Sequence, residues 1–98
     1  MNSIYNSSGQ RVGEYDGSTV YLDRRTAAKL EGNRVLSSSG SFLGTLEGQR
    51  VYRRGTSFVG TCEGGRIYKD GRSFVGEYTG DPIGGAAALL LWTKKLLP

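Results

Sequence analysis

Hydrophobic and polar residues alternate along most of this chain in a pattern that repeats about every 16 residues. A β-branched residue followed by Tyr or Leu begins each of five units: Ile4-Tyr5, Val20-Tyr21, Val35-Leu36, Val51-Tyr52 and Ile67-Tyr68. A second apolar stretch follows later in each unit, around Val12, Ala27, Leu43, Val59 and Val75. Extended, alternating segments rich in β-branched and aromatic residues are typical of β-strands. Each unit is therefore predicted to contain two strands of about five residues.

Two polar turn segments separate the predicted strands. An acid precedes the glycine that ends four of the units, as in Asp16-Gly17 and Glu63-Gly64, and such pairs favour tight turns in which glycine has a positive φ. The other turn lies mid-unit, as in Ser7-Ser8-Gly9-Gln10, and is one residue shorter in the second unit, at Asp23-Arg24-Arg25-Thr26. Each unit is thus predicted to be a β-hairpin. Five hairpins that pair in chain order are expected to close into a ring of about ten strands, because closure removes exposed strand edges.

The alternation also predicts which side chains face the inside of the ring, since residues two apart share a face. Phe58, Gly60 and Cys62 are expected to point inward, and Val59, Thr61 and Glu63 outward. The same parity assigns to the inside Phe42, Gly44, Leu46, Phe74, Gly76 and Tyr78. The glycines in this row have two interpretations: they leave room for a segment that passes close by, or they mark bends and bulges in curved strands.

Residues 82–98, PIGGAAALLLWTKKLLP, contain a long apolar run. Asp81 as N-cap and Pro82 at the first position suit a helix start, although Gly84-Gly85 could delay its onset. Three consecutive leucines make the helix apolar all round, as in a buried or membrane helix. Ten helical residues span about 15 Å, close to the length of a strand and well short of the roughly 20 residues that a bilayer needs. We expect this helix to fill the barrel; a membrane-bound tail and an oligomer-forming helix are the alternatives.

Together these patterns predict an all-β fold, a closed up-and-down barrel of five β-hairpins around a C-terminal hydrophobic helix. The 98 residues are expected to form a single domain, with the hairpins in residues 1–81 and the helix in residues 82–98. The lone cysteine, Cys62, excludes an internal disulfide and is expected to be a small buried residue. The N-terminal MNSIYNSSGQ lacks the features of a signal peptide, so a cytoplasmic location is the default expectation, with membrane association left open.

The repeat and the apolar C-terminal segment resemble the β-flower family. The resemblance lies in the recurring segments VGEYDG, LGTLEG, VGTCEG and VGEYTG, covers nearly the whole chain and includes no catalytic motif. It implies a bacterial protein whose hairpins surround a hydrophobic centre. That layout is similar to the Tubby C-terminal domain and the scramblase-like proteins, and the similarity implies a link to phosphoinositides or membranes.

Catalytic chemistry has little support in this sequence. Histidine, the commonest general base, is absent. The acids recur beside turn glycines in unit after unit, as structural turn residues do, and no GxxxxGK[ST] phosphate-binding segment occurs. We therefore expect no enzymatic activity, no cofactor and no metal site.

Three binding functions stay open. The first is association with an anionic lipid or membrane surface where the helix is expected to leave the barrel, with the contact residues Trp92, Lys94, Lys95, Leu96 and Leu97. The second is a protein-interaction or oligomeric module that contacts another protein or its own copies. The third and weakest is nucleic-acid binding through basic hairpin tips, with the residues Arg24, Arg25, Arg53, Arg54 and Arg72. The net charge of +4 suits an anionic partner and equally an ordinary soluble surface.

Overall fold

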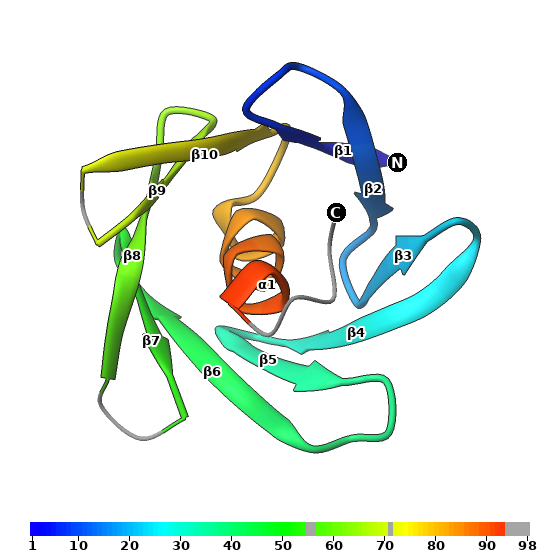
Figure 1. Cartoon of the computed structure of the whole chain (residues 1–98). Coiled ribbons are helices and arrows are strands. Elements are labelled where there is room, and N and C mark those ends of the chain that lie inside the picture. Colours follow the sequence, from blue (N-terminus) through cyan, green and yellow to red (C-terminus); the bar gives the residue numbers. More distant parts are fainter. Residues whose placement is uncertain (55–56, 71, 94–98) are drawn as a thin grey trace.

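Ten antiparallel strands close into a barrel around a helix in a computed structural model of the chain, which describes residues 1–54, 57–70 and 72–93 (Figure 1). The strands are β1 Asn2–Asn6, β2 Arg11–Tyr15, β3 Thr19–Leu22, β4 Arg25–Glu31, β5 Arg34–Ser37, β6 Phe42–Glu47, β7 Arg50–Arg53, β8 Ser57–Glu63, β9 Arg66–Lys69 and β10 Ser73–Tyr78. Each strand pairs with its neighbours in the chain, and β10 pairs with β1 to complete the ring. The predicted up-and-down barrel of five hairpins is confirmed.

Glycine with positive φ forms most of the connections between hairpins, as predicted. Gly32, Gly48 and Gly64 have φ angles of 61°, 66° and 59°. The prediction is wrong for Gly17, which does not adopt a positive φ. There the carboxylate of Asp16 shapes the turn instead, because it accepts hydrogen bonds of 2.9 Å from two following backbone N–H groups.

Every hairpin contains a one-residue shift in strand register. In the β7–β8 hairpin Val51 pairs with Gly60 and Tyr52 pairs with Phe58, so that Val59 is an extra residue between them. The same shift leaves one extra residue in each of the other hairpins: Val12, Ala27, Leu43 and Val75. A bulge of this kind bends the strand and interrupts the alternation of faces.

The bulge corrects the predicted orientation of the phenylalanines. Val59 and Gly60 are both buried, whereas Phe58 on the other side of the bulge is 45% exposed. The inward orientation predicted for Phe58, and by the same parity for Phe42 and Phe74, is therefore wrong, as is the outward orientation predicted for Val59. Residues beyond the bulge follow the prediction: Gly60 and Cys62 are buried and Glu63 is exposed.

The inner glycines lie where the bulged backbone and the helix come closest. A Cβ atom at Gly60 would overlap the carbonyl oxygen of Tyr68 and lie 2.8 Å from the side chain of Leu89. A backbone oxygen of the next strand and a helix side chain meet in the same way at Gly44 and Gly76. Both interpretations of this glycine row are therefore correct.

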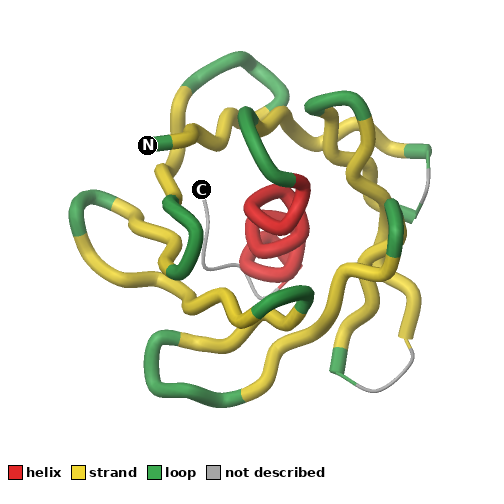
Figure 2. The backbone as a smooth tube through the Cα atoms, turned by 180° about the vertical axis from the view of Figure 1, so that it is seen from behind, coloured by secondary structure: helices red, strands yellow, loops and turns green. Residues whose placement is uncertain are grey.

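Helix α1, Pro82–Thr93, occupies the centre of the barrel (Figure 2). It begins at Pro82 as predicted, and the Asp81 carboxylate accepts a 3.0 Å hydrogen bond from the backbone N–H of Ile83. Residues 83–91 are all buried, so the helix fills the ring. The last residues of the predicted helix, 94–98, lie outside the described part of the chain. No helix among the described residues has the length and apolar character needed to cross a bilayer.

Gly84 and Gly85 do not delay the helix; they make room for two tyrosine rings. A Cβ atom at Gly84 would overlap the ring of Tyr15, and one at Gly85 would lie 2.6 Å from the ring of Tyr78. The hydroxyl of Tyr15 lies within hydrogen-bonding distance of the carbonyl oxygens of Thr79 and Asp81, the latter at 2.7 Å. Tyr15 thereby fixes the link between β10 and α1 to β2.

Candidate functional site at the helix exit

The two ends of the barrel are formed by different connections. The tip end contains the connections within the five hairpins, such as β1–β2 and β9–β10. The turn end contains the connections between hairpins, such as β2–β3, and the start of α1. Helix α1 runs from the turn end to the tip end, because Trp92 and Thr93 line grooves together with hairpin-tip residues such as Ser7 and Asp70. The structure thus brings Trp92 and the hairpin tips, two separate sets of predicted contact residues, to one end of the molecule.

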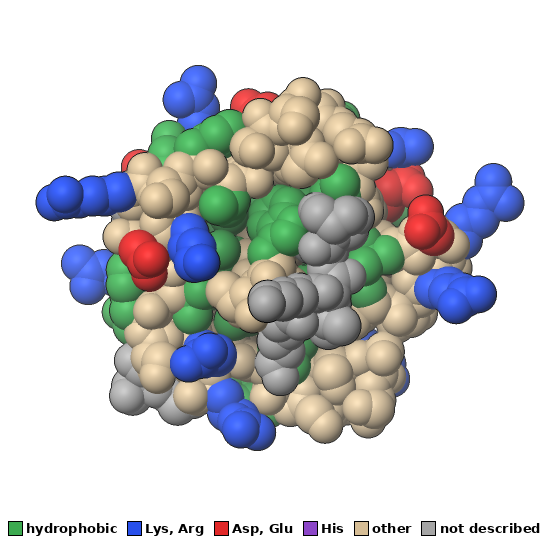
Figure 3. All heavy atoms as spheres, viewed as in Figure 1, with side chains coloured by type: hydrophobic (Ala, Val, Ile, Leu, Met, Phe, Trp, Pro, Cys, Tyr) green, Lys and Arg blue, Asp and Glu red, His purple; other side chains and the backbone are tan. Residues whose placement is uncertain are grey.

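Basic residues dominate the described part of the tip end. They are Arg11, Arg24, Arg25, Arg53, Arg54, Lys69 and Arg72, against the acids Asp23 and Asp70. All five arginines predicted as basic tips belong to this set. Figure 3 shows Lys and Arg side chains projecting from the periphery of this face, with hydrophobic side chains gathered near its centre.

Acidic residues gather at the turn end, where the strand register pairs them with arginine. The directly opposed pairs are Glu31 with Arg34, Glu47 with Arg50, and Glu63 with Arg66. Opposite charges in this position offset each other. At the tip end the register places Arg53 opposite Ser57 and Lys69 opposite Ser73, so these positive charges have no acidic partner across the hairpin. The uncompensated positive charge of the described barrel is therefore concentrated at the tip end.

Exposed aromatic residues lie beside these charges on the outer wall. Phe58 and Phe74 are 45% and 41% exposed. Each packs edge-to-face on the tyrosine across its hairpin, Tyr52 or Tyr68, with ring centroids 6.0 Å apart. Strand parity had assigned both phenylalanines to the core. The sequence contains a signal that could have predicted this orientation. An apolar residue directly precedes the inner glycine, so two neighbouring residues both suit the inner face, which simple alternation does not allow.

A groove lies between each pair of neighbouring hairpins at the tip end. The grooves range from about 220 Å³, between the first two hairpins, to about 460 Å³, between the third and fourth. The groove between the fifth and first hairpins measures about 420 Å³ and is lined in part by Leu89 and Trp92 of the helix. Residues 86–91 are buried. The helix therefore fills the centre, and the open apolar surface lies at the mouth.

The remaining predicted residues lie at the mouth, in the core or outside the described part of the chain. Trp92 lies at the mouth as expected, whereas Lys94, Lys95, Leu96 and Leu97 fall outside the described residues. Cys62 is fully buried, as predicted, and burial raises the pKa of its thiol to about 12. Within the described ranges, no three His, Cys, Asp or Glu residues form a group that could hold a metal ion.

Comparison with known proteins finds no protein-family model, curated protein or solved structure that matches this chain. The resemblance to the β-flower family therefore stays a prediction.

Proposed function

We propose that this protein is a non-enzymatic module that binds anionic lipid surfaces through its tip end. The observation that carries the proposal is that basic residues with no acid opposite them across the hairpin, such as Arg53 and Lys69, share one end of the barrel with exposed aromatic rings and the helix exit. At the other end Glu31, Glu47 and Glu63 lie opposite arginines. A bacterial origin, β-flower membership and a cytoplasmic location with membrane association belong to the same proposal.

The tip end offers both kinds of interaction that hold peripheral proteins on membranes. Basic side chains near an anionic bilayer contribute about 1 kcal/mol each. Aromatic residues such as Trp92 and Phe74 suit the headgroup region, because an apolar ring can enter it while polar atoms stay hydrated. Neither contribution alone gives firm binding, whereas several together do.

Protein interaction is the second candidate. The Tyr52–Phe58 and Tyr68–Phe74 pairs favour it, because their phenylalanines are exposed and aromatic residues are enriched at interfaces. Nucleic-acid binding has less support. Residues 7–10 and 38–41, the tips of the first and third hairpins, contain no basic residue, so the ring of positive charge is interrupted.

Vesicle co-sedimentation tests the lipid proposal. The protein should sediment with vesicles of phosphatidylcholine and phosphatidylserine, and should be released by high salt. Arg53→Gln/Arg54→Gln should weaken binding ~30-fold, from about 1 kcal/mol per residue. Lys94→Glu/Lys95→Glu should weaken it as well.

The matched control is Arg50→Gln/Arg66→Gln, which removes the same charge at the turn end and should leave binding nearly unchanged. Equal losses from both double variants would show non-specific attraction to net charge and refute a tip-end site. Equal sedimentation with pure phosphatidylcholine would refute the requirement for an anionic surface. Light scattering of the protein alone at several concentrations tests self-association, the competing function.

A further inference from the structure

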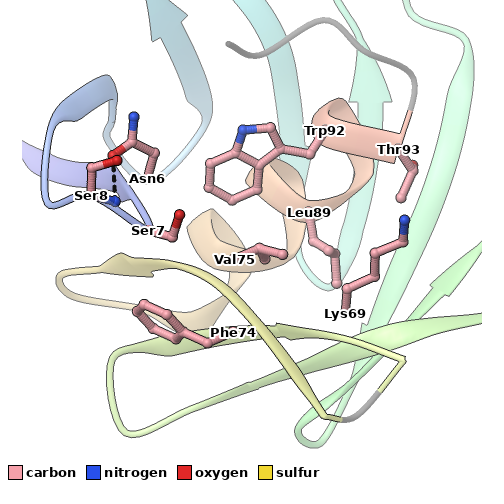
Figure 4. A pocket seen from close by; sticks show the side chains of 9 residues that line it. All are labelled: Asn6, Ser7, Ser8, Lys69, Phe74, Val75, Leu89, Trp92 and Thr93. Carbon is pink, nitrogen blue, oxygen red and sulfur yellow. Dashed lines mark hydrogen bonds between the residues drawn. The ribbon is translucent and has the colours of Figure 1, made fainter.

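The groove between the fifth and first hairpins differs from the other four in having apolar side chains of the helix in its lining. Leu89 and Trp92 of α1 line it together with Val75 of β10 (Figure 4). Trp92 lies close to β10, because the inner position there is glycine: a Cβ atom at Gly76 would be 2.7 Å from the indole ring. The groove is therefore apolar where it meets the helix.

Comparison with the groove between the second and third hairpins shows what is particular here. That groove is lined by Arg25 and by Leu22, Thr26, Ala27 and Ser38, the last four of which occupy the positions of Lys69, Phe74, Val75 and Ser7 in the repeat. It measures about 270 Å³ against about 420 Å³. Both grooves have a cationic residue in their lining, and only the larger one also has helix side chains.

The cationic residue of the larger groove is Lys69, which is exposed at the edge of the groove. In Figure 4 its amine lies beside Thr93, and the hydroxyl of Ser7 points toward the groove from the opposite side. Among the described residues, no carboxylate lies within ion-pair distance of the Lys69 ammonium. An apolar floor, a hydroxyl and an unpaired ammonium at one edge together suit a ligand with an alkyl chain and a single anionic group.

We propose that this groove binds a monomeric fatty acid of medium to long chain. The alkyl chain lies along Leu89, Trp92 and Val75, and the carboxylate accepts hydrogen bonds from the Lys69 ammonium. The volume of about 420 Å³ falls within the roughly 300–1,000 Å³ of small-molecule sites. This inference goes beyond the proposed membrane function, because a dissolved monomer needs no bilayer and contacts one groove rather than the whole tip end.

Trp92 makes the proposal directly measurable, because it is the one tryptophan of the chain. Titration with 12-bromododecanoate below its micellar concentration should quench Trp92 fluorescence in a saturable manner. Unlabelled octanoate, decanoate and dodecanoate should compete, with affinity rising about fourfold per methylene. Dodecanol, which lacks the carboxylate, should compete more weakly than dodecanoate.

Two pairs of variants distinguish binding in the groove from general effects of charge or of an added aromatic residue. Lys69→Gln should weaken dodecanoate binding about threefold to tenfold, whereas Arg72→Gln, the same charge change outside the groove lining, should not. Ser7→Phe should block the groove, whereas Ser38→Phe, at the equivalent tip of the third hairpin, should not. Thermal unfolding verifies that each variant folds.

Absence of saturable quenching in the wild-type protein overturns the proposal. So does equal binding by Ser7→Phe and Ser38→Phe, or affinity that does not depend on chain length. The outcome is distinct from that of the vesicle experiment. Vesicle binding without quenching by the monomer would support the membrane function and refute the fatty-acid site. Quenching without vesicle binding would support the fatty-acid site and refute the membrane function.

Discussion

Asp23 and Arg24 form the tip of the second hairpin with φ angles of 50° and 68°. The other described hairpin tips place a glycine or aspartate in this left-handed region, where most side chains cost about 1–2 kcal/mol. We expect Arg24→Gly to raise the free energy of unfolding by about 1 kcal/mol, measured by urea denaturation. Arg25→Gly, one residue on in β4, should lower it instead. A loss of stability in Arg24→Gly would contradict this account of the turn.

Cys62 is expected to make the protein sensitive to alkali. Its pKa is about 12 in the fold because the thiol is buried, against an ordinary value of 9.0. Between these values the unfolded chain has lost the proton and the folded one has kept it, so the free energy of unfolding should fall by about 1.4 kcal/mol per pH unit above pH 9. Burial also raises the pKa of Tyr15 and Tyr78 above 10.0, which adds to the decline at higher pH.

Urea denaturation between pH 7 and pH 10 measures this effect. Cys62→Val should show a nearly flat profile up to pH 10, where the tyrosines begin to titrate in the unfolded state. The native thiol should also resist alkylation by iodoacetamide. Rapid alkylation under native conditions, or the same pH profile in both proteins, would refute a buried thiol.

At the scale of single elements, the bulge recurs in all five hairpins, and an inner glycine follows it in four of them. Gly60→Ala should cost at least about 3 kcal/mol, because its Cβ would overlap the backbone oxygen of Tyr68. Gly13→Ala is the matched control in the first hairpin and should cost under about 1.5 kcal/mol. There the nearest atom, 2.9 Å away, belongs to the flexible side chain of Leu22, and the equivalent backbone oxygen, that of Tyr21, lies farther away at 3.1 Å.

The second hairpin carries Ala28 in the same column, so the bulge by itself accommodates a Cβ atom at this position. Differential scanning calorimetry of the two variants beside the wild type measures the difference. Similar losses in Gly60→Ala and Gly13→Ala would mean that the backbone oxygen yields as readily as a side chain, and would remove the structural reason for this glycine.

The sequence predicts best those features that residues close together in the chain determine. Hairpin number and helix position follow from local patterns: repeated V/I-Y pairs, turn glycines, and Asp81-Pro82 before an apolar run. Strand parity failed at Phe58 and Phe74, because alternation presumes an uninterrupted ladder and the bulge depends on pairing with the next strand. The shared location of Trp92 and the arginine tips could not be read from the sequence, since it depends on the end of the ring at which the helix enters.

On the scale of the whole molecule, the barrel supplies charges that the helix lacks. Helix α1 has no acid in its first turn and no base in its last. The acids Asp16, Glu31, Glu47 and Glu63 surround the end where it starts, and the basic tips surround the end where it stops. A helix has partial positive charge at its N-terminus and partial negative charge at its C-terminus. The uncompensated positive charge at the tip end therefore complements the C-terminal end of the helix dipole and lies on the proposed binding face.

The barrel is also expected to need the helix for its stability. A ten-stranded ring lined partly by glycine cannot fill its centre with its own side chains, since about eight strands is the limit for that. Residues 83–91 supply the missing core. A chain of residues 1–81 should therefore show no cooperative urea transition, whereas residues 1–93, which retain all of α1, should unfold with nearly the full-length midpoint. A cooperative transition in residues 1–81 would mean that the hairpins hold the barrel without its helix, and the helix would then be available for a role outside it.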